Sequence, residues 1–174
     1  MRGNTNVFLI GPMGSGKTAV GRQVARGLNL PFHDSDVEIE RRTGVDIPFI
    51  FDKEGEAGFR EREREALEAL AALEGIVLAT GGGAVLLPQN RRLLAARGRV
   101  VYLETSVAQQ AHRVRYGRHR PLLSEGDPTM RLGQLMEARA PLYAQIADIT
   151  VTTDGRRVQA VAEQILRELV EMRA

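Results

Sequence analysis

The chain has 174 residues, of which 43% are hydrophobic and 26% are charged, and its formal net charge at pH 7 is +2. This length predicts one domain over residues 1–174, and no apolar run approaches the roughly 20 residues that cross a bilayer. The absence of cysteine excludes disulfides and cysteine-based zinc sites. The nearly balanced charge argues against bulk binding of nucleic acid, and we expect no secretory signal because the N-terminus lacks an apolar core.

A glycine-rich turn at residues 11–18, GPMGSGKT, lies between an apolar run at 7–10 and a helical pattern at 19–25. This is the context of a P-loop, whose backbone N–H groups wrap a polyphosphate at a helix N-terminus. Lys17 would reach the β- and γ-phosphates, and the Thr18 hydroxyl would hold Mg²⁺. The alternative is a chance glycine-rich turn, which the flanking patterns disfavour. The motif indicates a nucleotide and does not identify a second substrate.

Apolar runs bounded by turn residues alternate with helical patterns along the chain. The runs lie at residues 7–10, 30–33, 76–79, 100–103 and 149–151, and the second is the weakest. Continuous apolar runs are typical of parallel strands that are buried on both sides. We therefore predict an α/β fold, a parallel sheet with helices on both faces. Ligands bind at the carboxyl ends of such strands, so the residues after each run are the candidates for a site.

Asp34 and Asp36 follow the second run. In an extended segment, side chains two residues apart point the same way, so both carboxylates would face the P-loop. One could serve Mg²⁺, and the other could accept the proton of a substrate hydroxyl. The alternative is a helix N-cap, because Asp and Ser often begin helices and residues 37–42 have a helical pattern.

Residues 59–70 predict a helix with a carboxylate, Glu63, in the middle of its apolar stripe, and with Arg60 at the edge of that stripe. A carboxylate on a buried face needs a charged partner, so we expect Glu63 to hold Arg60. A fixed guanidinium at a cleft can grip a substrate carboxylate bidentately. The other charges of this helix are interpreted as a solvated face. The apolar stripe is predicted to contain Phe59, Ala66, Leu67, Leu70 and Leu73.

Two further segments carry weaker signals. Gly81, Gly82 and Gly83 follow the third run, where glycine permits close approach of the backbone to a ligand, although a flexible turn is the commoner explanation. The arginine-rich segment 113–123 is interpreted as a lid that closes over ATP, with a solvated loop or an RNA-binding patch as alternatives. Arg139 is a further candidate anion ligand with little support from the sequence alone.

Together these motifs resemble those of the shikimate kinases, in the order of that family and over about residues 7–157. The resemblance implies a three-layer P-loop kinase fold of the nucleoside-monophosphate-kinase type, with a five-stranded parallel sheet and helices on both faces. It implies a substrate-binding segment at about residues 34–63 and a lid segment at about 114–126. The matching pieces are residues 11–18, Asp34 with Asp36, Ile47 with Phe51, Gly55 with Glu56, Phe59 and Arg60 with Glu63, residues 81–83, residues 120–123, and Arg139 with Pro141, Leu142 and Tyr143.

The resemblance also implies an activity, the transfer of the ATP γ-phosphoryl group to the 3-hydroxyl of shikimate. This is a step of chorismate and aromatic amino-acid biosynthesis, and the enzyme would be a cytoplasmic monomer that uses Mg²⁺ and binds neither nucleic acid nor membrane. Lys17, Asp36 and Arg120 would be catalytic, with Asp36 as the base. Thr18 and Asp34 would hold the metal.

The remaining roles are carried over by position. ATP would be bound by Gly14, Ser15, Gly16, Lys17, Thr18, Ala19, Arg113, Arg120 and Arg156. Shikimate would be bound by Asp36, Phe59, Arg60, Gly81, Gly82, Gly83 and Arg139, with Ile47, Phe51 and Glu63 in the pocket walls. Val158 or Gln159 stands where the family often has a proline, which affects the expected adenine contacts.

Two other functions stay open at this point. A related small-metabolite kinase, acting on aminoshikimate or gluconate, would use the same arginine and aspartate side chains. A P-loop regulatory or RNA-binding protein would use the loop as a switch, and the near-zero net charge argues against it.

Overall fold

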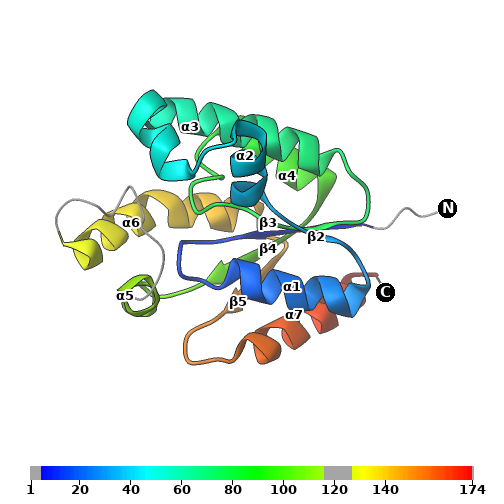
Figure 1. Cartoon of the computed structure of the whole chain (residues 1–174). Coiled ribbons are helices and arrows are strands. Elements are labelled where there is room, and N and C mark those ends of the chain that lie inside the picture. Colours follow the sequence, from blue (N-terminus) through cyan, green and yellow to red (C-terminus); the bar gives the residue numbers. More distant parts are fainter. Residues whose placement is uncertain (1–4, 116–126, 174) are drawn as a thin grey trace.

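The computed structural model describes residues 5–115 and 127–173, which form a five-stranded parallel sheet between two layers of helices (Figure 1). The strand order is β2-β3-β1-β4-β5, and every neighbouring pair is parallel. The predicted α/β class is confirmed. The strands are β1 (Asn6–Ile10), β2 (Phe32–Asp34), β3 (Val77–Ala79), β4 (Gly98–Glu104) and β5 (Ile149–Thr152).

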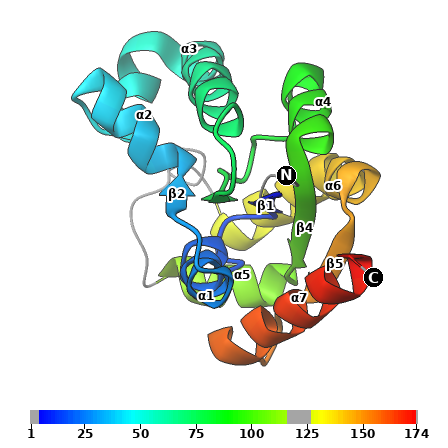
Figure 2. The same ribbon diagram turned by 90° about the vertical axis from the view of Figure 1, so that its right-hand side faces the viewer.

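Helices cover both faces of the sheet (Figure 2). On one face lie α1 (Lys17–Leu28) and α7 (Val158–Arg173), and on the other lie α3 (Ile47–Ala71), α4 (Pro88–Arg97) and α6 (Pro128–Ile146). The short helix α2 (Ser35–Thr43) packs against α3, and α5 (Val107–Arg115) packs against α6. No helix in the described part of the chain is long and apolar enough to cross a membrane.

The central position of β1 in the sheet explains the continuous apolar run at residues 7–10. Val7 and Leu9 point into the core on the α1 and α7 side, whereas Phe8 and Ile10 point into the core on the α3, α4 and α6 side. Successive side chains of a strand face opposite sides, so residues 7–10, covered on both sides, are all apolar, whereas the buried Asn6 that begins β1 is hydrogen-bonded to Leu73 and Ile76. By contrast, β5 is an edge strand in which Thr150 and Thr152 are exposed.

Two boundaries differ from the sequence prediction. The second strand begins at Phe32, because the N–H of Leu30 bonds to the carbonyl of Ala25 (2.9 Å) and closes the end of α1. Leu73, predicted to lie in the buried stripe of the helix, is 44% exposed because α3 ends at Ala71 and the helical period ends with it. Gly55 (φ 72°) interrupts the helical geometry within α3, so α3 consists of two helical pieces.

Candidate active site

The loop between β1 and α1 has the backbone conformation of a phosphate cradle. Gly11, Gly14 and Gly16 have φ angles of 147°, 77° and 90°, which residues with a Cβ rarely adopt. Gly16 is the N-cap of α1, and no side chain caps this helix. The first N–H groups of a helix have no partner within the helix, and they attract anions together with the helix dipole. The predicted P-loop therefore has the geometry that phosphate binding requires.

Two side chains at the start of α1 are positioned for a nucleotide and its metal. Lys17 Nζ lies within the loop and donates to the carbonyl oxygens of Gly11 (2.7 Å) and Pro12 (2.9 Å). Thr18 Oγ1 donates to Asp34 Oδ2 at 3.0 Å, which joins the P-loop to the end of β2. A hydroxyl and a carboxylate are hard oxygen ligands, and Mg²⁺ takes few such protein ligands because it keeps waters and phosphate oxygens. The Thr18 and Asp34 pair fits this metal.

The predicted extended arrangement of Asp34 and Asp36 is wrong. Helix α2 begins at Ser35, and Asp34 is its N-cap, with Oδ1 accepting from the N–H groups of Asp36 (2.9 Å) and Val37 (3.3 Å). Asp36 lies in the first turn of a helix, so the alternation of side chains along an extended segment does not apply to it. The N-cap alternative is confirmed for Asp34, although its second oxygen still faces Thr18.

The predicted partnership of Arg60 and Glu63 is confirmed. Arg60 NH1 lies 2.9 Å from Glu63 Oε1, and Arg60 NH2 lies 3.4 Å from Glu56 Oε1. Glu63 is completely buried, and burial raises the pKa of its carboxyl while the Arg60 guanidinium opposes that rise. Glu63 Oε2 and Arg60 Nε are buried without a hydrogen-bond partner among the described residues. The two ion pairs therefore hold the Arg60 guanidinium in place.

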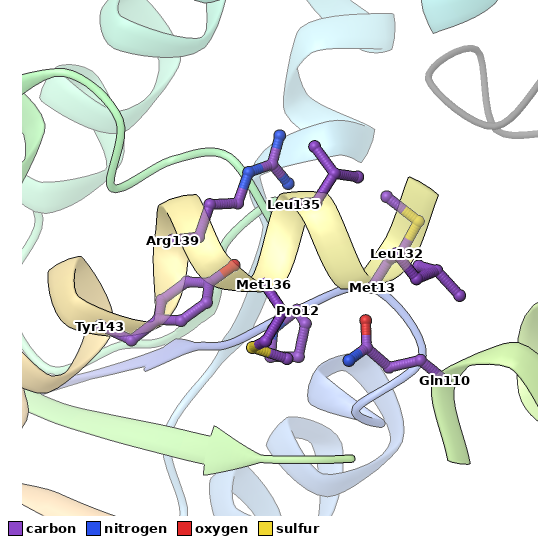
Figure 3. Close-up of a pocket in the computed structure, with 8 residues that line it drawn as sticks. All are labelled: Pro12, Met13, Gln110, Leu132, Leu135, Met136, Arg139 and Tyr143. Carbon is purple, nitrogen blue, oxygen red and sulfur yellow. The ribbon is translucent and has the colours of Figure 1, made fainter. Parts of the chain in front are cut away.

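Arg139, on α6, is the second buried arginine of the site, with 4% of its surface exposed. Burial lowers the pKa of its guanidinium, and the electrostatic interaction with Tyr143 opposes this shift. Arg139 and Tyr143 line one side of a hollow between the P-loop and α6, and Pro12 and Met13 line the other (Figure 3). Arg139 is thus next to the phosphate loop, a position that the sequence only weakly indicated.

The three consecutive glycines bring these groups together. A Cβ on Gly81 would lie 2.9 Å from Glu63 Oε2 and 3.2 Å from Asp36 Oδ1, which places both carboxylates beside Gly81. A Cβ on Gly82 would lie 3.3 Å from the N atom of Met13 and 3.4 Å from Arg139 NH1.

Gly83 lies against the guanidinium of Arg60, since three guanidinium atoms would be closer than 3.0 Å to a Cβ at this position. The glycine turn after β3 therefore lies next to both arginines, to Asp36 and to the P-loop. The site needs glycine here because the charged groups pack directly on the backbone.

The residues proposed to flank the adenine lie on the other side of the P-loop. Arg113 NH1, from α5, donates to the carbonyl oxygen of Gly14 at 2.7 Å. Arg156 donates to Thr152 O (3.1 Å) and to Gln164 Oε1 (2.6 Å), and so it holds the turn between β5 and α7. Arg120 and residues 116–126 of the predicted lid lie outside the described residues.

Tyr143 was one of the positions that match the family, but the sequence indicated no role for it in the site. Its hydroxyl donates to the carbonyl of Gly82, 61 residues away along the chain. The sequence places Tyr143 four residues after Arg139, on the same side of a helix, and this spacing is the one signal that links the two.

The fold and the site define a class of protein. A P-loop after the central strand of a parallel sheet, beside two buried arginines, is the arrangement expected of a P-loop kinase that acts on a small acidic molecule. Comparison with known proteins gives the family.

The family model described as shikimate kinase matches residues 13–170. A shikimate kinase of Thioalkalivibrio sulfidiphilus is 56% identical over 96% of this chain and 88% of its own length. One of Pseudomonas syringae pv. tomato is 53% identical over 96% of this chain and 97% of its own. The structure of the shikimate kinase from Acinetobacter baumannii in complex with shikimate superimposes with a TM-score of 0.94, at 46% identity, and covers 97% of this chain and 94% of that one. The chain belongs to the shikimate kinase family and is an enzyme of that family, with ATP as its co-substrate.

Proposed function

We propose that the chain transfers the γ-phosphoryl group of ATP to the 3-hydroxyl of shikimate across the junction of the P-loop and the glycine turn at residues 81–83. One observation carries this proposal: Asp36 lies beside Gly81, Arg139 beside Gly82 and Arg60 beside Gly83, and Gly82 also lies against Met13 of the P-loop. Phosphoryl transfer depends mainly on positioning and on neutralising charge, and this junction provides both.

The P-loop would hold the nucleotide. Gly14, Ser15, Gly16 and Ala19 would offer backbone N–H groups to the β-phosphate, and Lys17 would exchange its contacts with Gly11 and Pro12 for phosphate oxygens. The Thr18 and Asp34 pair would hold Mg²⁺, which neutralises phosphate charge when it is bound.

The glycine turn would hold shikimate. Arg60, fixed by Glu63, and Arg139 would clamp the carboxylate, since no ion pair among the described residues includes Arg139 and its charge is available to an anion. Asp36, beside Gly81, would accept the proton of the attacking hydroxyl as a general base. Phe59 is buried against Phe51 (4.8 Å between ring centroids) and would support the pocket from behind.

Further arginines would complete the ATP site. The family resemblance assigns Arg120, in a lid segment at about residues 114–126, to the transferred phosphate, and Arg113 and Arg156 to the adenine side. The contact of Arg113 with the Gly14 carbonyl supports its place at the nucleotide.

We also propose that the protein is a single-domain monomer and that it works in the cytoplasm, in aromatic amino-acid biosynthesis.

The experiment is a comparison of acceptors at saturating ATP and Mg²⁺. ADP release is measured with shikimate, aminoshikimate, gluconate and the methyl ester of shikimate, and the product is identified by phosphorus NMR. We expect efficient turnover with shikimate at the 3-hydroxyl and a large rise in KM for the neutral ester, because the ester loses the charge that the arginines bind. Gluconate or aminoshikimate as the better acceptor, or ATP binding without turnover of any acceptor, would contradict the proposal.

A further inference from the structure

Tyr143 presents its ring and its hydroxyl to different surroundings. The side chain is completely buried, and its ring stacks on Tyr102 with 5.0 Å between the centroids. Phe8, Ile10 and Val100 belong to the same apolar cluster. A phenylalanine would supply the same ring to this core, so core packing alone does not require the hydroxyl.

The hydroxyl has two partners, and both belong to the substrate site. It donates to the carbonyl oxygen of Gly82, and it interacts electrostatically with the guanidinium of Arg139, one helical turn away on α6. Tyr143 and Arg139 are side by side on α6 in Figure 3, at the edge of the hollow that faces the P-loop. A buried hydroxyl is costly unless it is hydrogen-bonded, so the bond to Gly82 ties this turn of α6, and with it Arg139, to the glycine turn.

The neighbourhood of Tyr143 and Arg139 also matters for charge. Arg60 forms ion pairs with Glu63 and Glu56, whereas within residues 5–115 and 127–173 no ion pair includes Arg139. Arg139 instead lies beside a neutral phenol, and burial raises the pKa of Tyr143, which keeps that phenol protonated. A neutral partner orients a guanidinium without cancelling its charge, and that charge stays available for an anion.

The peptide that Tyr143 holds is part of the same turn. The peptide bonds of the described residues are not cis, so the N–H of Gly83 points opposite to the Gly82 carbonyl that Tyr143 binds. Fixing the carbonyl therefore fixes the direction of the next backbone donor.

We propose that Tyr143 is a positioning residue for the acceptor: its one hydroxyl orients both Arg139 and the Gly82–Gly83 peptide, and thereby sets the affinity for the acceptor's carboxylate. This inference rests on the proposed role of Arg139 as part of the carboxylate clamp.

The test is Tyr143→Phe with Tyr102→Phe as the matched control, which removes a hydroxyl from the stacked partner ring. We expect Tyr143→Phe to raise the KM and the calorimetric Kd for shikimate by about 2- to 10-fold, the range of a single hydrogen bond, and to change the KM for ATP less than 2-fold. Tyr102→Phe should leave both constants unchanged. Circular dichroism and thermal unfolding verify that both variants fold.

A double-mutant cycle separates positioning from structure. If Tyr143 acts through Arg139, then Tyr143→Phe should change shikimate affinity less than 2-fold in an Arg139→Ala background. Equal shikimate constants for the two tyrosine variants, an equal rise in both KM values, or a full effect in the Arg139→Ala background would overturn the inference. If Arg139→Ala itself leaves the shikimate constants unchanged, then the proposed clamp fails, and that result is distinct from a failure of Tyr143 alone.

Discussion

The contact between Gly83 and Arg60 leads to a specific prediction for Gly83→Ala. The backbone of Gly83 is not in the left-handed region, so alanine brings no dihedral strain of its own. The new methyl group would instead fall within 3.0 Å of three guanidinium atoms of Arg60. Arg60 has little freedom to retreat, because it is 8% exposed and is tied to Glu63 and Glu56.

The magnitude follows from what the methyl group displaces. Overpacking a buried position costs about 1–3 kcal/mol. A complete break of the buried pair with Glu63 would raise the cost to about 3–5 kcal/mol, because a buried carboxylate would lose its partner. We therefore expect the free energy of unfolding to fall by about 1–3 kcal/mol if Arg60 shifts while keeping Glu63. The KM for shikimate should rise at least about 10-fold, since loss of one charge-assisted bond costs roughly 1.5–3 kcal/mol.

The assays are urea denaturation and steady-state kinetics with each substrate varied in turn. Gly133→Ala is the matched control, since a Cβ at this helical position meets nothing within 4 Å and alanine should stabilise α6 by about 0.5–1 kcal/mol. The KM for ATP should stay within about 2-fold in both variants, because neither change touches the P-loop. Wild-type stability together with a wild-type KM for shikimate in Gly83→Ala would refute the reasoning.

Three further predictions concern acidic side chains. Asp36→Asn should lower kcat by about 10²–10⁴-fold while ATP affinity, measured by calorimetry, stays nearly constant; nearly normal turnover would remove Asp36 as the base. Asp34→Asn should keep the N-cap of α2 and raise the Mg²⁺ concentration needed for half-maximal rate. Asp34→Ala should raise that concentration too, and it should also lower the free energy of unfolding in urea by about 1 kcal/mol. Equal unfolding free energies for the two variants would argue against the cap. The hydrogen bond from Arg41 lowers the pKa of Glu38 to about 2, so the stability that Glu38 contributes is present above its ordinary pKa and is lost as the pH falls through about 2. The wild type should therefore have a higher unfolding free energy than Glu38→Gln at neutral pH, and this difference should disappear as the pH falls from the ordinary pKa of a glutamate to about 2. A difference that stays constant with pH would contradict the stabilising role of the Glu38–Arg41 pair.

Local rules were enough to predict the P-loop and the Arg60–Glu63 pair. Both depend on residues within one turn or one helix, where spacing determines geometry. Glu63 was identifiable because a carboxylate on an apolar stripe must have a partner, and Arg60 is three residues away. The strands were predictable for a similar reason, since burial on both sides requires apolar residues at successive positions.

The rest depends on choices that the local pattern leaves open. Asp34 and Asp36 fit a strand end as well as a helix start, and the two bonds to Asp34 Oδ1 decide for the helix. The contact of Arg113 with Gly14 joins residues 99 apart along the chain, so only the sheet order brings them together. The same holds for Tyr143 and Gly82, and no spacing rule reaches across such separations.

The pairing of β1 with β3 is what joins the two halves of the proposed reaction. The P-loop follows β1 and the glycine turn follows β3, and adjacent parallel strands lie about 4.8 Å apart. The two loops therefore emerge side by side, and a Cβ on Gly82 would lie 3.3 Å from the Met13 nitrogen. A methyl group at Gly82 would fit only if the Met13 backbone or Arg139 shifted slightly, and transfer between two bound substrates is sensitive to such displacement. On this argument the glycines keep the acceptor within reach of the γ-phosphate, while Tyr143 and Glu63 hold the arginines that orient it.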